Sequence, residues 1–352
     1  EATNADTLQW AISVDPQFSG DVFIDASTVN PADFTLTGPT GATLSISVVT
    51  NAGESTATIF VTASGGDLAT YDGTVALGIA PGQDMRDLAG NPVTTSLANG
   101  SQSFSLDNTV PTLVSLVRQS PAGTNTNADS LTWRVTFSET VATVDATDFS
   151  VTGTTAQLSV APVVTAPTPG AGVSADAPTI SNIYDVTASG GDLGGLDANV
   201  TLVLTALAAA DPTGNLLAST TPTGANEHTF SLDNTAPTLT SVLRQTPSVE
   251  LTNADSLVWR VSFSEAIPNV TAADFSITGS TAGVTQISAA TAGFPPSVAG
   301  NTGNPVLAVA SNAYDITVSG GDLASVDGSV GLAIAAGNTI ADAVGNTLSG
   351  TT

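Results

Sequence analysis

The sequence predicts an all-β protein made of three tandem sandwich domains that form an elongated rod. Apolar residues alternate with polar ones in short runs, as at Leu257, Trp259, Val261 and Phe263, and turn-forming residues separate the runs. A period of two is typical of half-buried antiparallel strands. No stretch sustains the 3.6-residue period of an amphipathic helix. The chain is therefore expected to consist of short strands joined by turns.

Three motifs recur in the same order, with a period of about 125 residues. They are Thr3-Asn-Ala-Asp-Thr-Leu-Gln-Trp10, which returns at Thr126–Trp133 and Thr252–Trp259; Ser64-Gly-Gly-Asp-Leu68, which returns at Ser189–Leu193 and Ser319–Leu323; and Asp87-Leu-Ala-Gly-Asn91, which returns at Asp211–Asn215 and Asp342–Asn346. The repeats predict three domains, which we call unit one (residues 1–110), unit two (residues 111–236) and unit three (residues 237–352).

Each unit holds about seven predicted strands, which favours a β-sandwich of the immunoglobulin type. In unit three the predicted strands A to F are Leu239–Gln245, Leu257–Ser264, Asp274–Thr278, Val284–Ala289, Ala313–Val318 and Val330–Ile334, and strand G is expected after Asn346 by analogy with His228–Leu232 of unit two. The tryptophan of strand B is the expected core anchor of each unit, since the sequence has no cysteine for a disulfide.

Two strands of the repeat are missing from the sequence. Unit one begins in the A–B loop and lacks strand A, and unit three lacks strand G. One interpretation is a segment of a longer array of repeats. The other is that one molecule completes the next by strand exchange, which gives a filament.

Composition excludes several classes of protein. The chain has 352 residues, a formal net charge of −26, 31 acidic residues and five arginines, with no lysine. This charge opposes binding to nucleic acid or to an anionic membrane, and it favours cations as partners. Charged residues are only 10% of the chain and apolar residues 41%, which suffices for a core in each unit. No apolar run reaches the length of a membrane span.

The stretch Phe104–Thr112 has a second copy at Phe230–Thr238, and we call them the first and the second joint. Each reads as a short strand that is interrupted by Asp-Asn and then followed by Pro. Proline fixes φ, lacks an N–H and pushes the preceding residue towards an extended conformation. The two stretches therefore connect one unit to the next.

Strand direction in a seven-stranded sandwich brings the B–C and F–G loops to the pole where the chain enters, and the A–B and E–F loops to the opposite pole. At the first joint this gathers Asp107, Asn108, Glu139 and Asp211, faced by Asp67 and Asp6; at the second it gathers Asp233, Asn234, Glu265 and Asp342, faced by Asp192 and Asp129. Carboxylate and amide oxygens from several segments are the ligands that calcium requires. We therefore predict that calcium binds at the joints.

Asp-x-x-Gly-Asn, Ser-Gly-Gly-Asp and Thr-Asn-Ala-Asp are also typical turns, so turn formation remains an alternative role for their aspartates.

Unit one departs from this pattern. The Ser-Glu that ends strand B in the other two units is replaced by Val14-Asp15-Pro16 and an insertion that contains Asp21 and Asp25. A ligand role for the strand-B glutamate therefore does not extend to unit one.

The repeated motifs resemble the tandem immunoglobulin-like repeats of large bacterial surface proteins, such as the extender domains of RTX-type and biofilm adhesins. The likeness rests on Asn-Ala-Asp-Ser-Leu-x-Trp-Arg-Val-x-Phe-Ser-Glu, Ser-Gly-Gly-Asp-Leu, Asp-x-x-Gly-Asn and Leu-Asp-Asn-Thr-Ala-Pro-Thr, and it covers almost the whole chain. The joint is also similar to the calcium-binding linker of cadherins. The resemblance implies an extracellular, cell-surface rod that calcium stiffens, and it does not imply an enzyme.

Catalytic chemistry has little support in the sequence. His228 is the single histidine and lies in a predicted strand, and no Gly-x-Ser-x-Gly motif precedes it. Four of the five arginines fall at matched positions, Arg118 and Arg244 in strand A and Arg134 and Arg260 in strand B, which indicates structural pairing with nearby acids.

The expected function is thus a non-enzymatic extender segment of a secreted bacterial surface or adhesin-type protein, with neighbouring repeats or copies of itself as partners. The alternative is a self-assembling subunit of an extracellular filament or surface layer. A third hypothesis is an adhesin tip that binds a surface receptor or a glycan, although the sequence singles out no sugar-binding platform.

Overall fold

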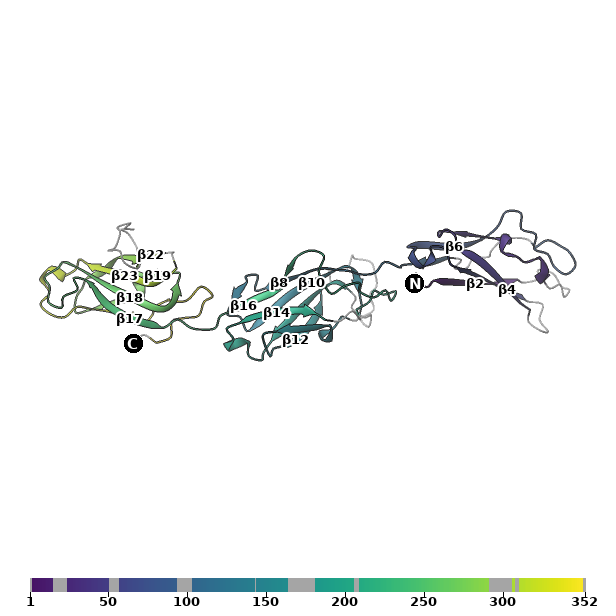
Figure 1. The fold of residues 1–352 in the computed structure, drawn as a ribbon. Coiled ribbons are helices and arrows are strands. Elements are labelled where there is room, and N and C mark those ends of the chain that lie inside the picture. The colour runs from purple at the N-terminus through teal and green to yellow at the C-terminus, as the bar shows by residue number, and fades with distance from the viewer. Residues whose placement is uncertain are drawn as a thin grey trace.

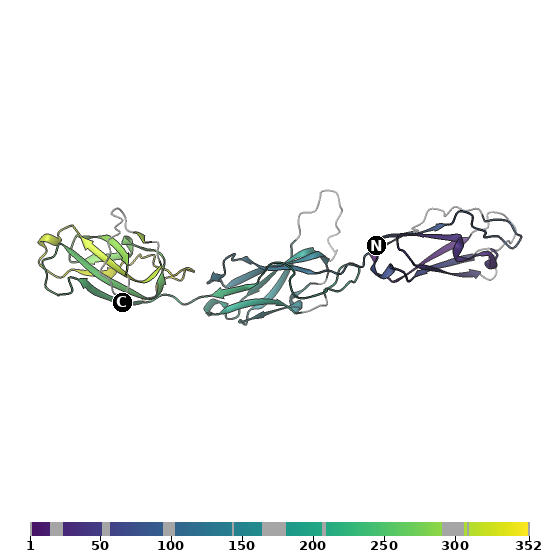
Figure 2. The ribbon, with the colours of Figure 1, turned by 45° about the horizontal axis from the view of Figure 1, so that its top comes forward.

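The computed structural model describes residues 2–14, 24–50, 57–93, 103–142, 144–163, 181–205, 209–290, 306–307 and 310–350. The predicted all-β class is confirmed, because strands dominate these residues and the helical segments are 3-10 helices of three residues each. Three β-rich parts follow one another in a row, and both views show short extended segments between them (Figures 1 and 2). Among the described residues, no helix has the length and the hydrophobicity needed to cross a membrane.

Unit one forms two sheets in the order β2-β5-β4 and β1-β7-β6-β3. Its elements are β1 (Ala2–Thr3), β2 (Thr7–Val14), η1 (Ala26–Thr28), η2 (Pro31–Asp33), β3 (Phe34–Thr37), β4 (Thr43–Thr50), β5 (Ala57–Ser64), η3 (Leu68–Thr70), β6 (Gly73–Ile79) and β7 (Ser103–Leu106). Strand β5 shows why the segment is a strand: its buried and half-buried residues alternate along all eight positions. No strand pairs with the outer edge of β2 among the described residues.

Unit two is the most complete of the three. Its elements are β8 (Leu113–Ser120), β9 (Asn125–Thr126), β10 (Ser130–Val141), η4 (Ala146–Asp148), β11 (Phe149–Thr152), β12 (Gln157–Pro162), β13 (Ser181–Ser189), η5 (Leu193–Gly195), β14 (Asn199–Leu204), β15 (Asn226–Glu227) and β16 (Thr229–Leu232). They form the sheets β12-β13-β10-β8-β15 and β11-β14-β16-β9. The last strand is divided between the two sheets, because β15 pairs with β8 whereas β16 pairs with β14.

Unit three repeats this plan without a final strand in its described residues. Its elements are β17 (Leu239–Thr246), β18 (Ser256–Ile267), β19 (Val270–Thr271), η6 (Ala272–Asp274), β20 (Phe275–Thr278), β21 (Gly283–Ala289), β22 (Val306–Leu307), β23 (Ser311–Ser319), η7 (Leu323–Ser325) and β24 (Gly331–Ile334). The sheets are β17-β18-β23-β21, β20-β24 and β19-β22. The predicted strands A to F correspond to β17, β18, β20, β21, β23 and β24, while the small β19–β22 pair was not predicted.

The buried residues gather within the units. One hydrophobic cluster is formed by residues from Leu8 to Leu106 of the sequence, and a second by residues from Leu113 to Leu232. Unit three contains two smaller clusters. The predicted core role of the strand-B tryptophans is confirmed: Trp10, Trp133 and Trp259 are 6%, 0% and 7% exposed. The immunoglobulin-type assignment and the domain boundaries stay predictions.

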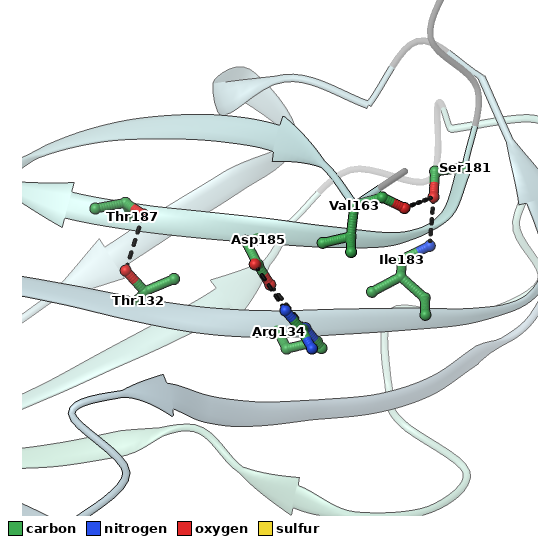
Figure 3. A network of polar contacts seen from close by, with 7 residues as sticks. All are labelled: Thr132, Arg134, Val163, Ser181, Ile183, Asp185 and Thr187. Carbon is green, nitrogen blue, oxygen red and sulfur yellow. Dashed lines mark hydrogen bonds and ion pairs between the residues drawn. The ribbon is translucent and has the colours of Figure 1, made fainter. Parts of the chain in front are cut away.

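Arginine pairing is confirmed on the outer face of the B and E strands. Arg134 lies directly opposite Asp185 across β10 and β13, and its Nε and Nη2 donate to the two carboxylate oxygens at 2.9 Å each (Figure 3). Arg260 and Asp315 repeat the pair between β18 and β23. These arginines neutralise acids within the sheet and form no cationic binding patch.

Candidate cation sites at the two joints

Strand β10 carries Glu139 to the pole where the chain enters unit two. Next to it, the backbone N–H of Ser138 donates to the carbonyl of Thr112, and its hydroxyl accepts from the Thr112 N–H, both at 2.9 Å. Ser264 and Thr238 form the same pair of bonds beside Glu265 of β18. The Ser-Glu sequence thus ties the end of each joint to strand B and places the glutamate beside it.

The Asp-x-x-Gly-Asn motif folds into a tight turn around its aspartate. Asp211 Oδ1 accepts the backbone N–H groups of Thr213, Gly214 and Asn215 at 2.9, 2.7 and 2.8 Å. Gly214 has a φ of 99°, which side chains with a Cβ rarely adopt. Asp342 is held in the same way in unit three. The predicted turn role of the motif is therefore correct, and the turn fixes the position of the carboxylate.

The asparagine of this motif connects the turn to the joint. Asn215 Nδ2 donates to the backbone carbonyl of Asp107 at 2.7 Å and to Asp211 Oδ2 at 2.9 Å. Asn346 does the same with Asp233 and Asp342, at 2.8 and 2.7 Å. One amide group in each unit thereby brings the aspartate of the joint next to the aspartate of the turn.

Three carboxylates meet at each joint. The groups are Asp107, Glu139 and Asp211, and Asp233, Glu265 and Asp342; within each, the carboxylate oxygens that can act as ligands all lie within 4.8 Å of one another. Two oxygens bound to one Ca²⁺ at 2.3–2.6 Å lie at most about 5 Å apart, so the spacing suits one such ion. An all-oxygen donor set suits a hard cation better than zinc, which prefers nitrogen and sulfur ligands.

The glutamates are the members of these groups whose charged form is least favoured. Burial raises the pKa of Glu139, and the nearby carboxylates of Asp107, Asp211 and Asp72 raise it further. Burial and the neighbouring aspartates raise the pKa of Glu265 in the same way. In both residues Oε1 is buried and has no hydrogen-bond partner among the described residues. A buried carboxylate oxygen without a donor is costly, and a bound cation would satisfy it.

The pKa of the aspartate in the turn is shifted in the opposite direction. Burial alone would raise the pKa of Asp211, which is only 4% exposed, but hydrogen bonds from Asn215, Thr213 and Gly214 outweigh this and lower the pKa. Asp211 therefore loses its proton at a lower pH than Glu139 does. A bound cation would favour the charged form of both carboxylates.

No basic side chain neutralises either group. All five arginines lie in the described residues, and their ion pairs there involve Glu227, Asp185 and Asp315. The sequence has no lysine. The three acids at each joint therefore depend on solvent ions for their counter-charge.

The predicted ligands Asn108 and Asn234 face the preceding unit instead. Asn108 Nδ2 donates to the carbonyls of Leu68 and Tyr71 at 3.0 and 2.9 Å, and its backbone N–H donates to Asp72 Oδ1 at 2.6 Å. Asn234 makes the equivalent bonds to Leu193, Leu196 and Asp197. These asparagines fasten the joint to the unit before it.

Asp67 and Asp192 are not brought into either group, contrary to the prediction. Asp67 accepts from the backbone N–H and the hydroxyl of Thr40 at 2.7 and 2.8 Å. Asp192 accepts in the same manner from Thr154 and Thr155. Each carboxylate accepts a hydroxyl and an N–H group of its own unit, and these hydrogen bonds stabilise the turn after strand E rather than the joint.

Asp72 and Asp197 were missed by the sequence reasoning. Each is an acid of the preceding unit whose charge raises the pKa of the glutamate at the joint, Asp72 for Glu139 and Asp197 for Glu265. The sequence contains a repeated pattern that could have identified them. Asp67 and Asp192 are each followed five residues later by a second aspartate, and so is Asp322, by Asp327.

The A–B loop contributes asparagine where aspartate was expected. Asn4 Nδ2 donates to Asn215 Oδ1 at 3.1 Å, and Asn127 Nδ2 donates to Asn346 Oδ1 at 3.0 Å. Both bonds run from one unit to the next. Asp6 and Asp129, two residues further along, are exposed and belong to neither carboxylate group.

Unit one has the turn without the rest of the site. Asp87 accepts from the backbone and the side chain of Asn91 at 2.7 and 2.8 Å. Asp15 and Asp21 of the insertion lie outside the described residues. Among the described residues, no third group of acids forms near Asp87.

Comparison with models of known protein families gives no match, and comparison with curated proteins gives none either. The functional conclusion therefore rests on the geometry of the joints.

Proposed function

We propose that this chain is a non-enzymatic structural segment, an extender of a secreted bacterial cell-surface or adhesin-type protein, in which calcium holds consecutive units in line. The observation that supports this proposal most strongly is the repetition of one arrangement at both joints. Each has three carboxylates in reach of one ion, a glutamate oxygen that is buried without a partner, and no basic side chain beside them. Turn chemistry accounts for Asp211 and Asp342, but not for the glutamates.

Each ion would join the segment between the units to the unit that follows. Asp107 belongs to the first joint, whereas Glu139 and Asp211 belong to unit two. Asn108 already fastens the same joint to unit one through Leu68 and Tyr71. Neutralising the acids removes the repulsion that otherwise drives Asp107 away from unit two. Calcium binding at such a site therefore restricts bending between the units.

Weak calcium sites suit an extracellular location, since extracellular modules bind calcium with dissociation constants of about 10⁻⁴–10⁻³ M. The net charge of −26 favours solubility and attracts divalent cations to the chain as a whole.

Calorimetric titration of the calcium-free chain with Ca²⁺ tests the proposal. We expect two sites for each chain, one after Glu139→Gln or Glu265→Gln, and none after both substitutions. Asp67→Asn is the matched control, because Asp67 lies outside both groups, and it should leave two sites. Binding that none of these substitutions changes would contradict the proposed ligands, and the absence of calcium binding would contradict the function.

A further inference from the structure

The asparagine of each Asp-x-x-Gly-Asn turn holds two aspartates with one end of its amide. Asn215 Nδ2 donates to the backbone carbonyl of Asp107 at 2.7 Å and to Asp211 Oδ2 at 2.9 Å. A carbonyl and a carboxylate oxygen only accept hydrogen bonds, so the amide must present its NH₂ group to both. The other end of the same amide, Oδ1, is then left for a donor from elsewhere.

A side chain of the preceding unit supplies that donor. Asn4 Nδ2 donates to Asn215 Oδ1 at 3.1 Å, and at the second joint Asn127 Nδ2 donates to Asn346 Oδ1 at 3.0 Å. All four asparagines are half-buried. Both ends of the Asn215 amide are therefore occupied, and a half-turn of the amide would place an oxygen against two other acceptors.

The A–B loop that carries this asparagine is itself bonded to the joint. The hydroxyl of Thr3 accepts the backbone N–H of Ala5 at 3.3 Å, and the carbonyl of Thr3 accepts the backbone N–H of Asp107 at 3.0 Å. Thr126 is bonded in the same way at the second joint, at 3.1 and 3.0 Å. The threonine thus holds the backbone of the joint, while Asn4 reaches the next unit.

The A–B loop and the turn of the next unit approach each other closely. A Cβ atom added to Gly214 would lie 3.6 Å from Asn4 Nδ2, and one added to Gly345 would lie 3.8 Å from Asn127 Nδ2. The backbone of each turn therefore packs directly against the asparagine of the preceding unit. The same contact occurs at both joints.

We propose that Asn4 and Asn127 are positioning residues of the two cation sites, an inference that rests on the calcium binding proposed above. Neither belongs to a carboxylate group, so neither is a ligand. Asn4 orients the Asn215 amide, and this amide holds Asp107 next to Asp211. A side chain of unit one thereby sets the affinity of a site whose acids lie in the joint and in unit two.

Calcium affinity consequently depends on the angle between consecutive units. A bend that separates the A–B loop from the turn breaks the bond between Asn4 and Asn215 and releases the amide. Such a bend would weaken calcium binding, because the amide no longer holds the two aspartates together. Coupling of this kind is reciprocal, so bound calcium opposes the bend by the same free energy.

Replacement of the asparagine by aspartate separates positioning from charge. Asn4→Asp places a carboxylate, which only accepts, against Asn215 Oδ1. The Asn215 amide must then lose this contact, or turn and lose its bonds to Asp107 and Asp211. An added negative charge near a cation would by itself tighten binding. Positioning therefore predicts weaker binding, whereas an effect of charge alone predicts tighter binding.

Calorimetric titration of the full chain with Ca²⁺ measures the effect on one site at a time. In the Glu265→Gln background, which should keep only the first site, we expect Asn4→Ala to weaken binding about fivefold and Asn4→Asp to weaken it at least as much. Asn127→Asp should not change this first site. Asn253→Asp is the matched control, because Asn253 has the same place in the motif of unit three, is exposed and lies in neither carboxylate group.

Thermal melts without calcium provide a second readout. The bond between Asn4 and Asn215 joins two units, so Asn4→Ala should leave the melting temperature of the calcium-free chain unchanged. A clear decrease would show that the asparagine stabilises its own unit and would overturn the proposal.

The titration distinguishes the two hypotheses. Unchanged or tighter calcium binding by the Asn4 variants would overturn the positioning role and leave the proposed function intact. An unsubstituted chain that binds no calcium would contradict the proposed function, and the positioning role with it.

Discussion

Acidic side chains are neutralised differently on the sheets and at the joints. On the outer face of unit three, Asp315 is 2% exposed and is bound by two nitrogens of Arg260 at 2.8 and 2.9 Å. At the second joint, Glu265 is half-buried, its Oε1 has no donor among the described residues, and the charges that raise its pKa are those of aspartates. The sheet carries its own counter-charge, whereas the joint must obtain one from solution.

The stability of each unit and the stability of the connection between units therefore depend on different counter-charges. An ion pair within one sheet stabilises that unit whatever ions the solution contains. A group of carboxylates at a joint becomes stabilising only when a cation is bound, so the solution controls it. Calcium would therefore act on the connection between units while the sheets remain folded.

The largest expected effect comes from breaking the counter-charge within the sheet. Arg260→Met leaves the buried Asp315 carboxylate without a partner and should lower the free energy of unfolding by about 2–3 kcal/mol, because the arginine is partly exposed and the full cost of a buried pair does not apply. Arg134→Met is the matched variant. The side chains of Arg134 and Asp185 are 33% and 26% exposed, so we expect about 1 kcal/mol or less. Denaturant unfolding measures both, and equal losses would contradict the role of burial.

Glu139→Gln should have effects of opposite sign in the two kinds of buffer. Without calcium, the substitution removes repulsion from Asp107 and Asp211, so the melting temperature of unit two should rise slightly. With calcium at about 100 times its dissociation constant, a site contributes about 2.7 kcal/mol, and the variant loses this. Its melting temperature should then be below that of the unsubstituted chain.

Asp192→Asn provides the control for this reversal. Asp192 braces a turn outside both groups, so the substitution should lower the melting temperature equally with and without calcium. A Glu139→Gln variant that behaves like Asp192→Asn would show that Glu139 binds no cation.

The smallest expected effect is the pH dependence of the calcium-free chain. Since the pKa values of Glu139 and Glu265 are raised in the folded chain, the folded state holds protons more tightly than the unfolded state. Stability should therefore fall as the pH rises from the ordinary glutamate value of 4.5 through the raised values. Thermal melts between pH 4 and pH 7 measure this slope, and the double variant Glu139→Gln/Glu265→Gln should flatten it.

Much of the fold followed from periodicity in the sequence. The alternation of residues such as Leu257 and Trp259 predicted β18, and the repeated motifs predicted that the same elements would occur again in each unit. The extent of β18 was underestimated, because Glu265, Ala266 and Ile267 continue the strand beyond the apolar alternation. The division of the last strand of unit two between two sheets has no sequence signal that we recognise.

The candidate sites were predicted in part, for a physical reason. Strand direction decides which loops share a pole, and this was sufficient to bring Asp107, Glu139 and Asp211 together. It does not decide where a carboxylate points within a loop. Asp67 turns towards Thr40 because a hydroxyl and an N–H lie beside it, and such local competition depends on coordinates.

Small-angle X-ray scattering of residues 1–352, with calcium and after chelation, tests the central claim most directly. With calcium the profile should fit one extended particle in which the units stay in a row, and chelation should broaden the distance distribution as the joints begin to bend. The Glu139→Gln/Glu265→Gln variant should give the broadened profile in both buffers. An unsubstituted chain whose profile is unchanged by chelation would contradict the claim that calcium holds the units in line.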